Sequence, residues 1–174
     1  MYKGLSMKAH CKFIGSAIFL LAIFSNTHVF AQDWTLQLTG EMKNPQTLTL
    51  KDISSFPRST VVGVDHDGKQ NEYEGVSLYY ILAKGGVPTG DSLHGKNLLL
   101  YLQAEALDGY KVIYALPEID TLFTSNTILV ADKKNGTALD SKEGPLQIIV
   151  PAEKKHSRWI RQLKTLNVLR SRQY

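Results

Sequence analysis

The chain has 174 residues, with 20 Lys and Arg against 16 Asp and Glu, a formal net charge of +4 and one cysteine. This length suits one domain, and a single cysteine excludes a disulfide framework and a cysteine-based zinc site. Part of the positive charge lies in the N-terminal leader described next, so it does not indicate nucleic-acid binding.

The first 31 residues have the pattern of a secretory signal peptide. Three lysines precede an apolar run over residues 13–24, and small or modest side chains follow at Val29 and Ala31. The run is shorter than the roughly 20 residues of a membrane-spanning helix, which favours cleavage after Ala31 over a membrane anchor. A start at Met7 would leave this signal intact. The leader has no paired arginines, so we expect general export to a periplasmic or secreted location, with no membrane attachment after cleavage.

The expected mature domain, residues 32–174, differs in composition from the whole chain. Without the three lysines of the leader, 17 basic and 16 acidic residues remain, so the net charge is about +1. Because Cys11 lies in the leader, the domain has no cysteine, which excludes thiol catalysis, disulfide exchange and any cysteine-based metal site. We expect no nucleic-acid partner for it.

The first half of this domain predicts short strands and one clear helix. Alternating or β-branched residues indicate the strands, and Asp67-Gly68 predicts a tight hairpin turn. Ser77 is the predicted N-cap of a helix with apolar residues at helical spacing, which ends at Gly85-Gly86. The predicted segments are strands at 34–40, 48–50, 59–65 and 71–75, a helical turn from 51 and a helix from 77.

The second half continues the same pattern. The apolar run over residues 97–103 predicts a central strand that is buried on both faces, and Asn135-Gly136 predicts a loop tip. Many short strands, few short helices and no repeated strand–helix–strand unit predict an α+β domain with a mixed, β-rich sheet or partial barrel. The other predicted segments are strands at 110–114, 127–131, 146–150 and 166–169 and short helices at 115–119 and 157–163.

Two stretches are candidates for ligand contacts. Asp108-Gly109-Tyr110 lies between two strands, where glycine adopts a backbone angle that other residues resist, although the sequence alone favours a simple turn with Tyr110 packed outward. The basic cluster at residues 154–161 follows Val150-Pro151 and leads into a predicted helix N-terminus, a place that suits an anion. Its alternative is a solvated face with Trp159 or Ile160 packed inward. The predicted ligand contacts are Asp108, Gly109, Tyr110, His156, Arg158 and Arg161.

Other candidate sites have simpler explanations. Asp65-His66-Asp67 reads as a polar hairpin tip because three adjacent strand residues cannot easily converge on a metal, so we predict no metal site. The glycines at residues 85–90 lack the Gly-Lys-Ser/Thr ending of a phosphate loop. A hydrolase would need a histidine near a nucleophile elbow, and none of His66, His94 and His156 has this setting.

The order of these motifs resembles the oxidoreductase molybdopterin-binding domain family, which has the sulfite oxidase fold. The resemblance covers nearly all of residues 32–174. It is carried by Tyr73-Glu74-Gly75-Val76-Ser77-Leu78, Asp108-Gly109-Tyr110, Ile128-Leu129-Val130-Ala131, Gly144-Pro145-Leu146, Ile149-Val150-Pro151 and Arg158-Trp159-Ile160-Arg161.

The resemblance implies a molybdopterin cofactor, with Asp108-Gly109-Tyr110 and residues 150–161 on the pterin side. Arg158 falls where the family often has an arginine, if one extra residue precedes it, and Arg161 where it often has a lysine. The family's molybdenum-binding cysteine would lie within residues 62–65, where this chain has none, and Ala152 replaces a usual glycine. Members of the family are generally exported folded, which this leader does not suit.

Two functions follow from these observations. The first is an exported binding or accessory module that keeps the fold without molybdenum redox chemistry. It would need no cofactor, and it would bind a small anionic or pterin-like ligand or a protein partner. The alternative is a molybdopterin-dependent oxidoreductase with an atypical metal ligand.

Overall fold

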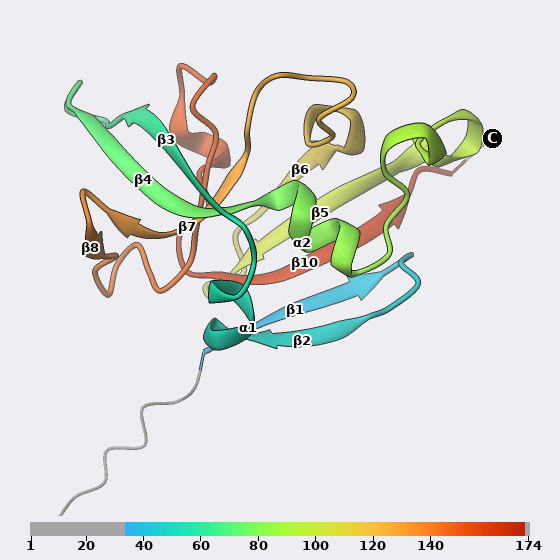
Figure 1. Ribbon diagram of the computed structural model, residues 1–174, viewed down its shortest axis with the longest axis horizontal. Helices are drawn as coiled ribbons and strands as arrows, with labels where there is room; N and C mark the ends of the chain where they lie inside the picture. The colour runs from blue at the N-terminus through green and yellow to red at the C-terminus, as the bar shows by residue number, and fades with distance from the viewer. Residues whose placement is uncertain (1–33, 173–174) are drawn as a thin grey trace, which may run out of the picture. The chain divides into compact units, whose positions relative to one another are not determined.

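The computed structural model describes residues 34–172, which form two β-sheets connected by short helices (Figure 1). The predicted signal peptide and its cleavage after Ala31 lie outside the described residues. No helix in this described range is long and apolar enough to cross a membrane.

The first sheet is mixed. Strand β1 lies parallel to β10, and every other neighbouring pair is antiparallel. The β1–β10 pairing joins the two ends of the domain, because Gln37 lies opposite Thr165 in the register. The sheet order is β2 (Gln46–Thr49), β1 (Thr35–Gly40), β10 (Leu163–Arg170), β5 (Leu100–Ala106) and β6 (Lys111–Ala115).

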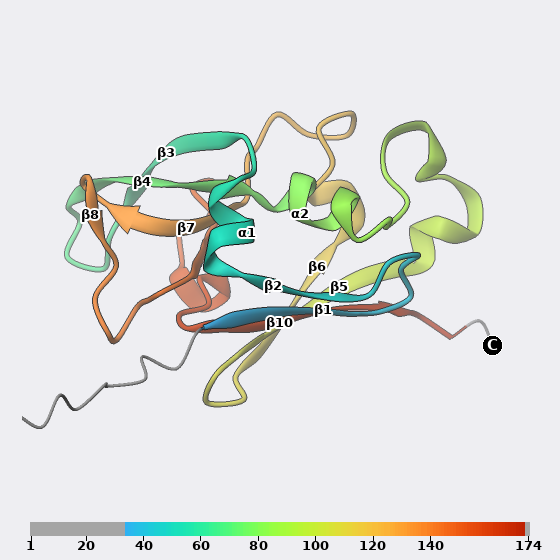
Figure 2. The same cartoon turned by 60° about the horizontal axis from the view of Figure 1, so that its bottom comes forward.

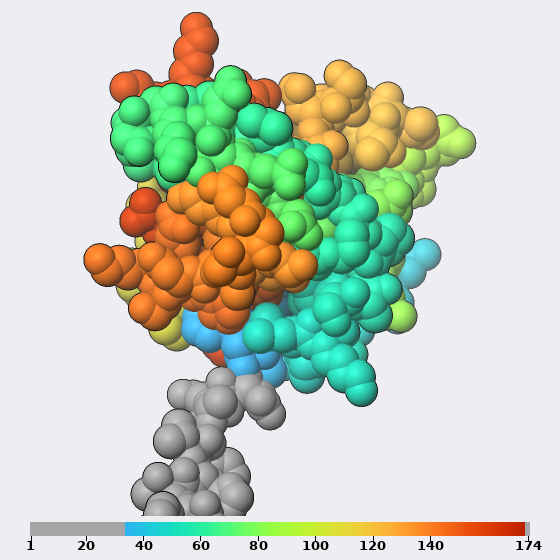
Figure 3. Space-filling view, turned by 60° about the vertical axis from the view of Figure 1, so that its left-hand side comes forward, coloured from blue at the N-terminus to red at the C-terminus, as the bar shows by residue number. Residues whose placement is uncertain are grey.

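The second sheet is antiparallel throughout its described strands. It contains β3 (Arg58–Val64), β4 (Gln70–Ser77), β7 (Leu129–Lys134) and β8 (Thr137–Ala138) in that order, and β9 (Gln147–Ile149) also pairs with β7. Figure 3 shows β4, in green, beside the β7–β8 segment, in orange. The two sheets form layers (Figure 2) and do not close into a barrel, so the β-rich mixed architecture is confirmed and the expected closure is not.

Two α-helices connect the layers. Helix α1 (Leu50–Ser54) begins with a capping box in which Thr49 and Asp52 exchange hydrogen bonds. Helix α2 (Leu78–Lys84) follows Ser77, whose side chain makes no cap hydrogen bond, so burial of its apolar face stabilises its start. The other short helical segments are 3₁₀-helices: η1 (Gly90–Ser92), η2 (Gly95–Leu99), η3 (Leu116–Glu118) and η4 (His156–Arg158).

Two predicted elements are wrong. The strand at 97–103 begins only at Leu100, after η2, and its side chains alternate between buried and half-buried because only one face of the sheet meets the core. The helix at 157–163 is replaced by η4 and an irregular segment that bends at residues 161–162 before β10 begins. Ile148 N donates to Ile160 O at 2.8 Å and Leu163 N to Leu146 O at 2.9 Å, so these residues pair with the β9 segment instead of forming a helix.

Candidate ligand-binding site

The predicted basic cluster folds as a short turn anchored by Trp159. Its indole Nε1 donates to the Val150 carbonyl at 3.1 Å, and its buried ring packs edge-on against Tyr73 with centroids 5.7 Å apart. The His156 ring lies against Trp159 with the ring centroids 4.2 Å apart and the planes tilted by 54°. Burial of Trp159 and Ile160 therefore turns the neighbouring Arg161 outward, where it is exposed.

A groove of about 250 Å³ lies beside this turn, and we call it the Tyr110 groove. Four of the six predicted contact residues meet there. The Tyr110 hydroxyl donates to the Ser157 carbonyl at 2.9 Å, which ties the β5–β6 turn to η4. The Tyr110 groove is lined by Ala106, Asp108, Tyr110, His156, Ser157, Trp159 and Arg161.

The Asp108-Gly109-Tyr110 turn shapes the wall of this groove. Tyr110 N donates to Asp108 Oδ1 at 2.9 Å, so the carboxylate caps its own turn. Gly109 has φ +86°, a conformation that side chains resist, and does not line the groove. The turn explanation from the sequence therefore applies here, and the turn positions Tyr110 on the groove wall.

A second hollow of about 200 Å³, the Gln147 cavity, shares one wall with the Tyr110 groove. His156, Trp159 and Arg161 line both, and Asp65, His66 and Gln147 complete the second. The His66 and His156 rings meet edge-on at 4.3 Å. Sequence reasoning missed Gln147, although a glutamine inside the apolar run of residues 146–150 was a signal that a polar group had a reason to be buried.

Ion pairs distinguish the charged side chains that already have a partner from those that could pair with a ligand. Lys134 Nζ donates to Asp65 Oδ2 at 2.7 Å, and this hydrogen bond lowers the pKa of the Asp65 carboxyl. Glu143 lies 3.5 Å from the same ammonium. Across residues 34–172, Arg161 makes no ion pair, so its guanidinium is available to a ligand.

Arg158 differs from Arg161 in that its guanidinium is already paired, although the sequence analysis predicted that both would contact the ligand. Its Nη1 and Nη2 atoms each lie 3.0 Å from a Glu118 carboxylate oxygen, and its Nε donates to Glu153 at 2.6 Å. The guanidinium also lies 4.8 Å from the centre of the Tyr114 ring. The hydrogen bonds that its guanidinium donates to Glu118 and Glu153 raise the pKa of Arg158. Arg158 lines neither cavity, so we assign it a structural role in place of the expected anion contact.

The strand region where the resemblance places a metal-binding thiolate offers no such ligand. Val62 and Val64 are 57% and 48% exposed and have hydrocarbon side chains. A Cβ on Gly63 would lie 2.6 Å from Trp159 Cη2 and 3.2 Å from Tyr73 Cε2, so the ring of Trp159 fills that position. Within the described residues, no three His, Cys, Asp or Glu side chains could together hold a metal. These residues do not fit a molybdenum centre that needs a protein thiolate.

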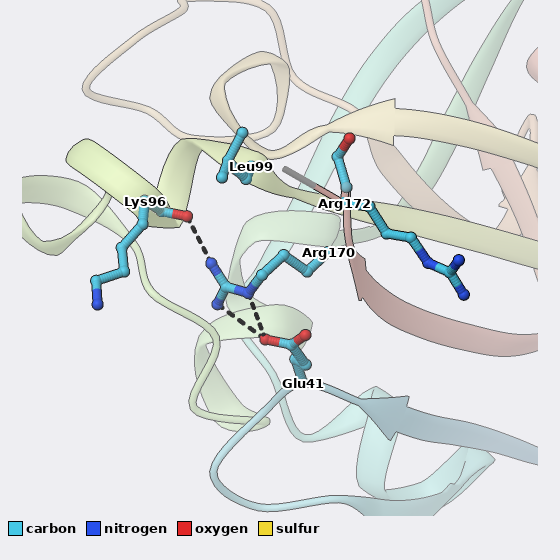
Figure 4. A pocket seen from close by; sticks show the side chains of 6 residues that line it. Glu41, Lys96, Leu99, Arg170 and Arg172 are labelled. Atoms are coloured by element: carbon cyan, nitrogen blue, oxygen red, sulfur yellow. Dashed lines mark hydrogen bonds and ion pairs between the residues drawn. The ribbon is translucent and has the colours of Figure 1, made fainter. Parts of the chain in front are cut away.

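A larger hollow, about 690 Å³, lies elsewhere, beside the end of β10 (Figure 4). Arg170 Nε donates to Glu41 Oε2 at 2.8 Å, and its Nη1 donates to the Lys96 carbonyl at 2.6 Å. None of the predicted contact residues lines it. Because the arginine at its centre is already paired, we favour the two smaller cavities as the ligand site.

Comparison with known proteins agrees with this fold. The sequence model of the oxidoreductase molybdopterin binding domain family matches residues 24–174. Among solved structures, the sulfane dehydrogenase SoxCD from Paracoccus pantotrophus is similar at 22% identity and a TM-score of 0.63, over 79% of this chain and 38% of that chain. The predicted sulfite oxidase-like fold is thereby confirmed, while the matched region is well under half of the SoxCD chain. No curated protein matches.

Proposed function

Because the chain belongs to the oxidoreductase molybdopterin binding domain family, we propose that it uses this fold as a binding module without molybdenum redox chemistry. Its ligand is a small anionic or pterin-like molecule held at the Tyr110 groove. We further propose that it acts after export, in the periplasm or as a secreted protein.

The contact between Gly63 and Trp159 carries this proposal. A thiolate would have to arise from residues 62–65, and there the valines carry no ligand atom, Trp159 covers the glycine and the Asp65 carboxylate is paired with Lys134. The indole is held on both sides, by its hydrogen bond to Val150 and by its contact with Tyr73. The hollow that remains suits a small ligand, since pockets for drug-sized molecules are roughly 300–1,000 Å³.

The residues around the Tyr110 groove are suited to anion binding. The unpaired Arg161 guanidinium presents several N–H donors in a planar fork, which matches a carboxylate or phosphate. Lys154 and Lys155 are exposed on the same loop and add positive charge nearby. Tyr110 and His156 form the walls, and the Tyr110 hydroxyl is held in place by Ser157.

Two other functions have support from particular observations. His66 and His156 bring two imidazoles together at the Gln147 cavity, and an oxidoreductase with an atypical metal ligand would use them, although no three His, Cys, Asp or Glu side chains of residues 34–172 are arranged to hold a metal. Leu107, Tyr110 and Ile113 are exposed on and near the β5–β6 turn, which favours a protein partner. The missing thiolate and the unpaired arginine favour the anion-binding module over both.

The Arg161→Ala variant tests the anion site. We expect it to weaken binding of inorganic phosphate or pterin-6-carboxylate by about tenfold to a hundredfold, because a hydrogen bond to a charged group contributes roughly 1.5–3 kcal/mol. Isothermal titration calorimetry measures this change. Arg172→Ala removes the same side chain from an exposed position at the distant hollow and should leave the affinity unchanged. Equal affinities for wild type and Arg161→Ala would contradict the assignment.

Metal analysis tests the absence of molybdenum chemistry. We expect protein purified from its native compartment to contain much less than one molybdenum per chain, whether or not a pterin is released on denaturation. Mass spectrometry with an inductively coupled plasma measures the metal, and fluorescence measures the pterin. Stoichiometric molybdenum together with a pterin would establish the oxidoreductase alternative instead.

A further inference from the structure

Gln147 is a buried amide with an unsatisfied acceptor. Its residue is 3% exposed, and its side-chain Oε1 has no hydrogen-bond partner in the described structure. Its backbone is paired in the sheet, opposite Ala131 of β7, so the strand holds the side chain in place. Leaving such a group unpaired costs about 1–3 kcal/mol, and proteins rarely retain that cost without a compensating contact.

The surroundings of Gln147 indicate what supplies the missing contact. Gln147 lines the second cavity together with Asp65, His66, His156, Trp159 and Arg161, and the Asp65 carboxylate is already paired with Lys134. The two imidazoles come from different parts of the chain, one from the β3–β4 turn and one from η4. Arg161 lines both cavities, so a ligand whose negative charge pairs with this guanidinium can extend a second group toward Gln147.

We infer that the Gln147 cavity is a specificity subsite that selects small hydroxy acids. This inference rests on the proposed anion site. The carboxylate pairs with Arg161, and the hydroxyl donates to Gln147 Oε1. An acid without the hydroxyl leaves that oxygen unpaired, so it binds more weakly. A cavity of about 200 Å³ accepts an acid of this size. A site built to hydrogen-bond a ligand hydroxyl rejects the analogue without it because buried polar groups are then left unpaired.

Calorimetry with matched acids tests this subsite. The probes are malate against succinate and lactate against propionate, which differ within each pair by one hydroxyl. We expect wild type to bind the hydroxylated acid about tenfold more tightly. Gln147→Leu should remove this preference, because leucine has no acceptor. Gln103→Leu is the matched control, since it makes the same change on a half-buried residue of β5 in the other sheet and should keep the preference.

Thermal unfolding of the ligand-free protein supplies an independent readout. Gln147→Leu should raise the midpoint by a few degrees, because it removes an unpaired buried oxygen. A lower midpoint would show that Gln147 is held by a buried water as a structural element, and would overturn the inference.

The outcomes separate this inference from the anion site itself. If both acids of each pair bind equally, and Arg161→Ala weakens both, the anion site stands and the subsite is wrong. If Arg161→Ala changes the affinity for neither acid of a pair, the proposed function fails as well. Failure of all four acids to bind wild type would also overturn the subsite.

Discussion

Replacing Arg158 with alanine is expected to lower the free energy of unfolding by about 2–3 kcal/mol, because it leaves two carboxylates beside each other without their shared cation. The guanidinium bridges Glu118 of η3 and Glu153 of the loop before η4, and also donates to the Ile113 carbonyl at 3.0 Å. Its side chain is about one-third exposed, so solvent reduces the effect below that of a fully buried pair. Urea denaturation followed by circular dichroism measures the change.

Arg161→Ala is the matched control for this prediction. The two arginines lie three residues apart in the same segment, but Arg161 is exposed and makes no ion pair in residues 34–172. Its replacement should change the free energy of unfolding by less than about 0.5 kcal/mol. Arg158→Lys should lose part of the stability, because an ammonium cannot match the fork that pairs with Glu118. If Arg158→Ala binds the anion more weakly but keeps the same free energy of unfolding, Arg158 contacts the ligand and its structural role is wrong.

Gly63→Ala is expected to lower the free energy of unfolding by about 2–3 kcal/mol, because the added methyl group overpacks a filled region. It would lie 2.6 Å from Trp159 Cη2 and 3.2 Å from Tyr73 Cε2. Neither ring moves easily, because both are buried and Trp159 is fixed by its hydrogen bond to Val150. Urea denaturation again gives the difference.

A double-mutant cycle with Trp159→Phe identifies the cause. Phenylalanine is shorter and vacates the position of the distant indole carbon, so Gly63→Ala should cost less than about 1 kcal/mol in that background. The cycle therefore measures the contact that carries the proposed function. The same cost in both backgrounds would mean that the backbone of β3, and not Trp159, excludes a side chain at residue 63.

Local patterns predicted most of the elements because short-range chemistry governs them. The Asp67-Gly68 and Asn135-Gly136 turns form where expected, and Asn135 and Gly136 both take positive φ angles of 50° and 76°. The segment at 157–163 could not be predicted in this way. Its backbone pairs with residues 146–148, and this partner lies outside the window in which helical periodicity is judged.

The sequence by itself determined the family, the β-rich class, the absence of cysteine after Cys11 and the region of the chain that carries the candidate site. Only the tertiary structure decided which arginine is available. Arg158 and Arg161 have the same chemistry, and they differ because Glu118 and Glu153 reach only the first. The structure alone also placed Trp159 over Gly63 and left Gln147 unpaired. The contacts of Arg158 with Glu118 and of Trp159 with Gly63 join residues that are distant in the chain, so their geometry depends on how the chain packs.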